Sequence, residues 1–262
     1  MSIRIENVVT PSPEQWKTTI LGARNAMNSW EKGDSHQCEL MCDRSTYSDN
    51  PCPHRFTYCI GPNDLGLMMK LRNAGTDHRK FMRMITVYTD ITAPLYWWKE
   101  FDTYKVGTVA NSCSTMHKIA DKEFTLEDFS CEHLCKATDD VHKEFCDYME
   151  SLGNPKGEFE ISPYRLMQDD IIELNAWRDF YLHYKNKPHK DLKAHEENLK
   201  KIWWQMIQLL PSSYNQRRTV MLNYEVLANI YKSRKNHKLD EWHEFCAWIE
   251  TLPYAKELII GE

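Results

Sequence analysis

A chain of 262 residues, 42% hydrophobic and 12% aromatic, is long enough for one substantial core or two small domains and too apolar to be disordered. Its net charge of −5, with both signs interspersed, gives no indication of nucleic-acid or membrane binding. The N-terminal residues lack the apolar core of a signal peptide and no apolar run approaches a membrane span, so we expect a cytoplasmic protein.

The first predicted elements are a strand and a helix. Apolar and polar residues alternate over residues 3–9, which predicts an edge strand. Ser12, Pro13 and Gln15 then supply an N-cap, a first-turn proline and a capping-box partner, so a helix is expected to about Asn28. Its inward face would carry Trp16, Ile20, Ala23 and Met27.

An insertion and a second strand follow. Residues 33–61 are rich in Gly, Pro, Ser, Asp and Asn, which predicts a long, mostly irregular loop. Asn63 or Asp64 would cap the next helix. The run 81–91 alternates and is β-rich, so it predicts a central strand, and a helix over 95–101 follows. The three consecutive aromatic residues of that helix are more typical of core than of a ligand platform.

The remainder is predicted to be mostly helical. Residues 124–152 favour two helical pieces, and helices are expected over 167–185, 195–210 and 240–252. The inward apolar stripe of the first region would be Val141, Phe145, Tyr148, Met149 and Leu152. Strands followed by many helices predict the α+β class.

Nine cysteines, in a reducing compartment, indicate mostly free thiols. Cys38/Cys42 and Cys131/Cys135 share the spacing Cys-x3-Cys, which fits either half of a zinc site or one buried helix face. Neither pair has the glycine or proline of a zinc knuckle, so we predict no metal site. The other potential ligands of such a site are Cys52, His54 and Cys59.

Three polar residues on a predicted long helix after Pro211 carry the functional prediction. Arg234 lies eleven residues beyond Asn223, three turns up on the same helix face, and Asn229 lies between them. An amide and a guanidinium on one face would bind carbonyls, ring nitrogens or phosphate. The alternative is an ordinary solvated helix face.

Together with a Leu-Pro opening at 210 and an Asp-Glu-Trp close from Asp240, these residues resemble the C-terminal signature of the flavin-dependent thymidylate synthases, the ThyX family. That signature reads Leu-Pro, Asn-x-Arg-x3-Asn-x4-Arg and His-Ala-Gln-x-Glu. Glu225 replaces its first arginine and Asp240 its glutamine. The resemblance implies a single domain over 1–262, with a small central, mostly antiparallel sheet flanked by many helices.

The sequence resembles a second family motif, Arg-His-Arg-x7-Ser-x-Arg, more weakly. Here Tyr104, Lys105 and Val106 stand in place of the basic triplet, Ser114 remains, and Met116 replaces the last arginine. The family's Glu-His pair before the central strand is replaced by Arg83-Met84. Lost positive charge would have to come from Arg24, Arg79, Lys105 or Lys118, and Lys105, Ser114, His117 and Lys118 would suit an anion.

The resemblance also implies residue roles. Arg234 would be catalytic, stabilising negative charge on a uracil ring. The residues expected to hold FAD are His78, Tyr104, Lys105, Asn223 and Asn229. The residues expected to hold the substrate are Lys99, Glu100, Ser114, Lys118 and Arg234.

The function implied is FAD-dependent transfer of a one-carbon group to C5 of dUMP or a related pyrimidine nucleotide, with NADPH and methylenetetrahydrofolate as co-substrates, in a homotetramer. The alternative is a ThyX-like scaffold that has lost catalysis and binds a nucleotide or a protein partner.

Overall fold

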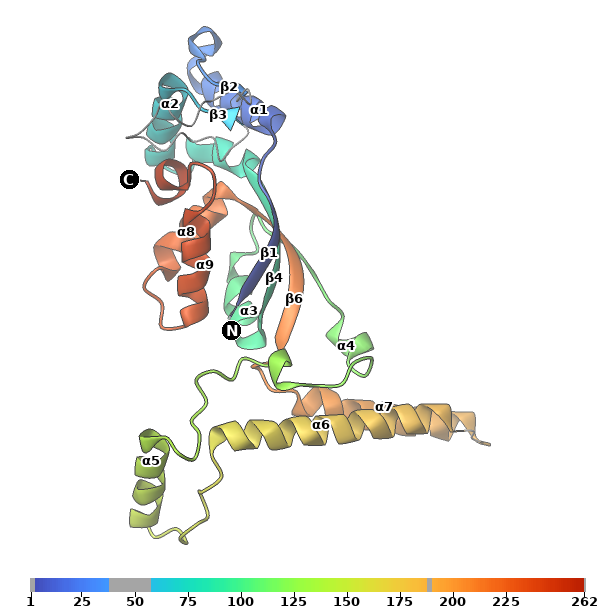
Figure 1. Ribbon diagram of the computed structural model, residues 1–262. Coiled ribbons are helices and arrows are strands. Elements are labelled where there is room, and N and C mark those ends of the chain that lie inside the picture. The colour runs from blue at the N-terminus through green and yellow to red at the C-terminus, as the bar shows by residue number, and fades with distance from the viewer. Residues whose placement is uncertain (1–2, 38–57, 188–189, 262) are drawn as a thin grey trace, which may run out of the picture. The chain divides into compact units, whose positions relative to one another are not determined.

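The computed structural model describes residues 3–37, 58–187 and 190–261 (Figure 1). The chain forms two compact units, which are described separately below. The hairpin unit contains Ala93–Lys99 and Ser112–Gln216, and the sheet unit contains Ile3–Thr92, Glu100–Asn111 and Arg217–Glu262. Within the described ranges, no helix combines the length and the apolar character that crossing a membrane requires.

Four strands form the main sheet of the described residues, in the order β1-β4-β6-β5. Their bounds are Arg4–Val9 for β1, Thr86–Pro94 for β4, Asn215–Asn223 for β6 and Val109–Ser112 for β5. β1 is the edge strand that the sequence predicts, and it pairs antiparallel with β4, Arg4 opposite Thr92. The α+β class, with a small sheet among many helices, is confirmed.

Helix α1 (Pro13–Arg24) begins as predicted. The Ser12 side chain accepts from the Gln15 N–H, and the Gln15 side chain accepts from the Ser12 N–H at 2.8 Å, which completes the capping box. Trp16 is buried. The predicted inward position of Met27 is wrong, because the α-helix ends at Arg24 and the 3-10 turn η1 (Asn25–Met27) leaves this side chain 64% exposed.

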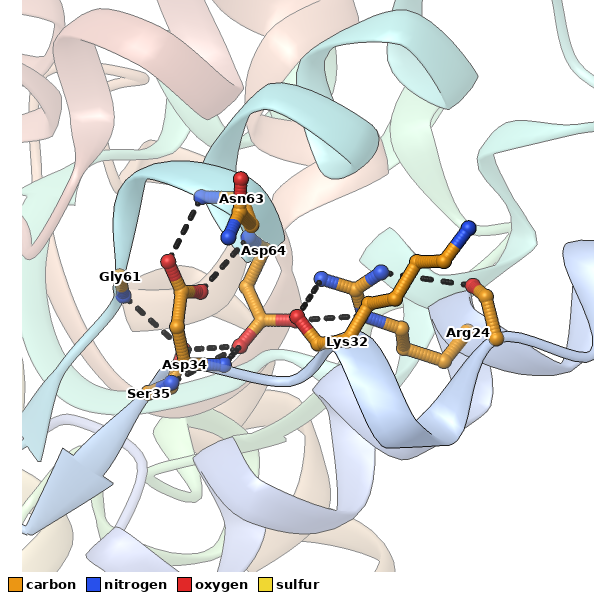
Figure 2. A network of polar contacts seen from close by, with 8 residues as sticks. Arg24, Lys32, Asp34, Ser35, Gly61, Asn63 and Asp64 are labelled. Carbon is orange, nitrogen blue, oxygen red and sulfur yellow. Dashed lines mark hydrogen bonds and ion pairs between the residues drawn. The ribbon is translucent and has the colours of Figure 1, made fainter.

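Helix α2 (Pro62–Asn73) has Gly61 as its N-cap, two to three residues before the cap that the sequence predicts. Asp64 is not the cap, since its carboxylate is buried and accepts from Arg24 Nε at 2.6 Å. The Asp34 carboxylate instead accepts from the N–H groups of Asn63 and Asp64. Figure 2 shows this network, in which Asp64 also accepts from the backbone and hydroxyl of Ser35.

The network joins the two ends of the predicted insertion. These ends also pair as two short strands, β2 (His36–Gln37) and β3 (Tyr58–Cys59), preceded by the 3-10 turn η2 (Trp30–Lys32). The flanks of the insertion are therefore ordered rather than irregular. The middle of the predicted loop, 38–57, lies outside the described residues, and so do Cys38, Cys42, Cys52 and His54.

The predicted central strand over 81–91 begins too early. Residues Arg79–Met84 form a 3-10 helix (η3) that buries Phe81 and Met82, and β4 starts only at Thr86. Helix α3 (Leu95–Phe101) follows as predicted and continues into the 3-10 turn η4 (Asp102–Tyr104). Trp97 and Trp98 are fully buried, which confirms that these aromatic residues belong to a core.

The predicted long helix carrying Asn223, Asn229 and Arg234 is wrong. The segment before Asn223 is strand β6, and only then does α8 (Tyr224–Arg234) begin, followed by α9 (Asp240–Glu250) and the π-helical turn η6 (Lys256–Ile260). β6 lies between β4 and β5 in the sheet, so both its edges are hydrogen-bonded. Pairing with strands far away in sequence overrides the helical spacing of the three polar residues.

The hairpin unit is built on α6 (Pro163–Asn186) and α7 (Leu192–Leu209), which run side by side (Figure 1). Both helices are longer than the predicted 167–185 and 195–210. The shorter elements of the unit are α4 (Thr115–Lys118), the 3-10 turn η5 (Leu126–Asp128) and α5 (Asp140–Ser151). The fully buried residues at the centre of the unit's core are Leu174 and Met206.

The apolar stripe predicted for the inward face of α5 faces solvent instead. Val141 is 67% exposed and Tyr148 and Leu152 are each 60% exposed. The helical period of these residues predicts the helix correctly, but α5 turns His142 inward instead, where it is buried against the Glu160 carbonyl.

Candidate functional site

Arg234 is the centre of a polar cluster in the sheet unit. Its Nη1 donates to Glu100 Oε2 at 2.7 Å and its Nε donates to the Tyr104 hydroxyl at 2.9 Å. The guanidinium carbon lies 4.8 Å from the ring centroid of Trp242. We call Glu100, Tyr104, Arg234, His237 and Trp242 the Arg234 cluster.

The sequence folds locally so that these side chains converge. Arg234 ends α8, and the turn into α9 brings His237 and Trp242 back past it. Glu100 is in the last turn of α3, and Tyr104 ends η4 directly after it. Arg234, with a side chain only 17% exposed, is therefore held on two sides by rigid elements.

Glu100 connects the cluster. Its Oε2 accepts from Arg234, from the Trp242 indole N–H at 2.9 Å and from His237 Nε2 at 3.3 Å. His237 Nδ1 accepts from the Leu239 backbone N–H at 3.2 Å, which leaves Nε2 as the ring nitrogen that faces Glu100. Glu100 thereby fixes the direction in which the guanidinium points.

The second amino group of that guanidinium is not used by the cluster. Arg234 Nη2 makes no hydrogen bond to any residue that the structure describes. A fixed, half-buried guanidinium with a free amino group can bind a carbonyl, a carboxylate or a phosphate with little loss of side-chain entropy.

Asn223 does not project along a helix face. It is the N-cap of α8, where its Oδ1 accepts from the Val226 N–H at 3.0 Å and its Nδ2 donates to the Gly107 carbonyl at 3.1 Å. Gly107 has φ +88°, and a Cβ there would lie 2.7 Å from Asn223 Nδ2. Asn223 thus holds the turn after Lys105 against the start of α8.

Two departures from the family signature face each other. Glu225, in the place of an arginine, accepts from Arg83, which stands where an acidic residue is expected, and from Arg79 at 3.3 Å. The hydrogen bond and the charge of Glu225 raise the pKa of the Arg83 guanidinium. The two substituted residues therefore form an ion pair with each other.

The other predicted residues are dispersed. Lys105 and Asn229 are exposed, and His78 is exposed at the start of η3; none of the three bonds to the Arg234 cluster. Lys99, Ser114 and Lys118 lie in the hairpin unit. Ser114 accepts from the His117 N–H, as the cap of α4, and Asp121 raises the pKa of Lys118 by hydrogen bonding at 2.9 Å.

The replacements suggested for the lost basic residues are mostly committed elsewhere. Arg24 is buried against Asp64, Arg79 is bound to Glu225 and Lys118 is paired with Asp121. Within the part of the chain that the structure describes, Lys105 makes no ion pair. It is the cation of the four that can meet a ligand.

His237 and Trp242 were not predicted as site residues. The signal for His237 is its place three residues after Arg234 in a helix-ending turn, and for Trp242 its place in the closing Asp-Glu-Trp. Cys131 and Cys135 are half-buried free thiols, and the described residues contain no group of three potential metal ligands.

The solved structures that share this fold include the following three. Thymidylate synthase X from Helicobacter pylori, with FAD and dUMP, is 13% identical over 99% of this chain and 97% of its own, with a TM-score of 0.53. A second Helicobacter pylori structure, flavin-dependent thymidylate synthase ThyX complexed with FAD and dUMP, is 13% identical over 98% of both chains, with a TM-score of 0.50. The UMP/dUMP methylase PolB from Streptomyces cacaoi, bound with 5-Br dUMP, is 12% identical over 99% and 95%, with a TM-score of 0.54. No family model and no curated protein matches the sequence.

Proposed function

We propose that this chain, which is ThyX-like in fold and divergent in sequence, is an enzyme that methylates a pyrimidine nucleotide. Its reaction would be FAD-dependent transfer of a one-carbon group to C5 of dUMP or a related pyrimidine deoxynucleotide, with methylenetetrahydrofolate and NADPH as co-substrates. The similar structures were solved with dUMP or a brominated analogue, which supports the nucleotide class.

The Arg234 cluster is the observation that carries this proposal. A pyrimidine ring presents carbonyl oxygens, and negative charge grows on the ring when C5 becomes nucleophilic. The free Nη2 of Arg234 would donate to such an oxygen and stabilise that charge, while Glu100 and Tyr104 keep the guanidinium in place. Since the donor is already oriented, little reorganisation is needed at the moment of reaction.

Three of the residues expected to hold the flavin have side chains whose chemistry suits that cofactor. Lys105 offers a charge to a phosphate of the cofactor, and His78 and Asn229 are exposed donors for its polar edges. Asn223 would act indirectly, because its amide holds the Gly107 turn beside Lys105. When bound, the flavin would supply the redox chemistry that protein side chains lack.

A second candidate is a ThyX-like scaffold that binds a nucleotide or a protein partner without catalysis. The observation in its favour is that Asn223 is committed to capping α8 and Tyr104 to Arg234, two of the five residues expected to hold flavin. The two candidates differ in whether the protein takes up FAD.

The first test is the visible absorbance of the purified protein, repeated after FAD is added and excess is removed by desalting. A retained flavin spectrum supports the enzyme and justifies turnover assays with dUMP. A colourless protein that takes up no FAD contradicts the enzyme and leaves the scaffold.

Arg234→Ala tests the nucleotide site separately. We expect at least about 100-fold weaker dUMP binding by calorimetry, because a charge-assisted hydrogen bond to a fixed donor is lost. Glu100 keeps its bonds to Trp242 and His237, so the fold should persist. The matched control is Lys232→Ala, an exposed cation on the same helix, which should bind dUMP as wild type. Unchanged affinity in Arg234→Ala would remove Arg234 from the site.

We also propose, from the same resemblance, a cytoplasmic homotetramer. The exposed apolar side chains of α5, among them Val141 and Tyr148, support association with further chains.

A further inference from the structure

A cavity lies within the hairpin unit and shares no residue with the Arg234 cluster. It has a volume of about 340 Å³ and opens between α4 and the paired helices α6 and α7. The lining residues used below are His117, Tyr181, Lys185, Glu196, Lys200 and Trp203. The volume is at the lower end of the roughly 300–1,000 Å³ typical of small-molecule sites.

Two aromatic side chains form its walls. The Trp203 indole N–H donates to the Met116 carbonyl at 2.9 Å, which fixes the ring against α4. Tyr181, from α6, is half-buried, and its hydroxyl makes no hydrogen bond to a described residue. A rigid indole and a phenol with a free hydroxyl suit a flat ring that also carries polar atoms.

The cavity lining carries two lysines and two carboxylates, and one of these carboxylates is paired with a lysine outside the lining. Lys185 and Lys200 come from the two facing helices, and neither forms an ion pair within the described ranges. Asp121 is already paired with Lys118 at 2.9 Å, so Glu196 is the remaining acidic group that lines the cavity. Two ammonium groups on opposite sides match a phosphate monoester, which carries about −1.5 to −2 charge near neutral pH, better than a carboxylate.

We propose that this cavity binds a ligand that joins an aromatic ring to a phosphate monoester. The ring lies against Trp203 and Tyr181, and the phosphate accepts from Lys185 and Lys200, with His117 at the same rim. This inference is independent of the proposed enzymatic function, because it stands even if the Arg234 cluster binds nothing.

The probe is phenyl phosphate, and the readout is the indole N–H signal of Trp203 in a two-dimensional ¹⁵N–¹H spectrum. That signal is assigned by its disappearance in Trp203→Leu, and the signal of the adjacent, outward-facing Trp204 by Trp204→Leu. We expect phenyl phosphate to shift the Trp203 signal and leave the Trp204 signal in place. Inorganic phosphate alone should shift it far less, since it has no ring to stack.

Neighbouring lysines provide matched variants that cannot disturb a core. Lys200 lines the cavity, whereas Lys201 does not, and both are exposed. Lys200→Ala should weaken phenyl phosphate about tenfold, through loss of one charge-assisted contact, and Lys201→Ala should leave the affinity unchanged. Arg234→Ala should also bind phenyl phosphate as wild type.

Three results would overturn the proposal. The first is no shift of the Trp203 signal up to about 10 mM phenyl phosphate. The second is equal affinity in the Lys200 and Lys201 variants. The third is loss of phenyl phosphate binding in Arg234→Ala, which would place the phosphate at the Arg234 cluster. Absence of flavin uptake or of dUMP binding would contradict the proposed function alone.

Discussion

Glu225 shows how a residue that departs from a signature can have a partner of opposite charge that departs from it too. Its carboxylate is buried and accepts from Arg79 and Arg83, so the arginine expected at position 225 would meet two like charges here. The two departures therefore depend on each other, and a one-residue comparison counts both as losses.

Exchanging these charges tests that dependence. Arg83→Glu and Glu225→Arg should each lower the thermal unfolding midpoint, because each leaves like charges together at a partly buried site. The double variant should recover most of the loss, since the pair is restored with its signs exchanged. If the decreases in midpoint of the two single variants simply add in the double variant, the two positions are not coupled.

Asp64 is a buried carboxylate whose ionisation should matter for stability. Burial alone would raise its pKa, but hydrogen bonds from Ser35 and the Asp34 backbone, together with Arg24, outweigh that effect and leave the pKa below its ordinary value. A lowered carboxyl pKa stabilises the fold above the unfolded value of about 3.9, and this contribution is lost as pH falls below it.

Asp64→Asn should therefore cost about 3–5 kcal/mol in the free energy of unfolding at pH 7, because Arg24 is left buried without its counter-charge. Denaturant titrations at several pH values should also show less loss of stability below about pH 4 than in wild type. The matched control is Asp121→Asn, which removes an exposed ion pair and should leave the midpoint unchanged. If Asp121→Asn lowers the free energy of unfolding as much as Asp64→Asn does, the effect comes from the change in net charge and not from the buried ion pair.

For helices and strands, the sequence predicts where an element starts and its periodicity better than it predicts which other elements it packs against. The Ser12 capping box places α1 because all its information lies within four residues. β6 was predicted as helix because its pairing with β4 and β5 depends on residues more than a hundred positions away. The stripe on α5 likewise predicts a helix but not what covers it.

The same limit applies to the site. Arg234, Glu100 and Tyr104 were expected and are brought together. The turn between α8 and α9 brings His237 to these residues. The Gly107 turn is what the amide of Asn223 holds while it caps α8. The spacing of residues in these two turns does not predict their geometry.

Two phenylalanines in different helices test the inferred exposure of α5. Phe245 in α9 is fully buried against the rings of Phe101 and Trp242, and Phe145 in α5 is 45% exposed. Phe245→Ala should lower the free energy of unfolding by about 3–5 kcal/mol, and Phe145→Ala by less than about 1 kcal/mol. Equal losses in urea titrations would mean that α5 packs its stripe in the isolated chain.

For the whole molecule, the exposed apolar residues of α5 and the proposed function make the same prediction about assembly. Sedimentation velocity should give four times the mass of the 31.1-kDa chain. Phe145→Lys in the stripe should shift the distribution towards smaller species, and Lys201→Ala should not. A mass of one chain at every concentration would contradict the tetramer.

The strand order also has a consequence for synthesis on the ribosome. β1, β4 and β5 are complete by Ser112, yet β6, which must lie between β4 and β5, begins only at Asn215. At roughly 5 to 20 residues per second, about 5 to 20 s separate these events. During that interval β5 has no neighbour and β4 has one open edge, so the nascent chain exposes strand edges that chaperones would need to shield.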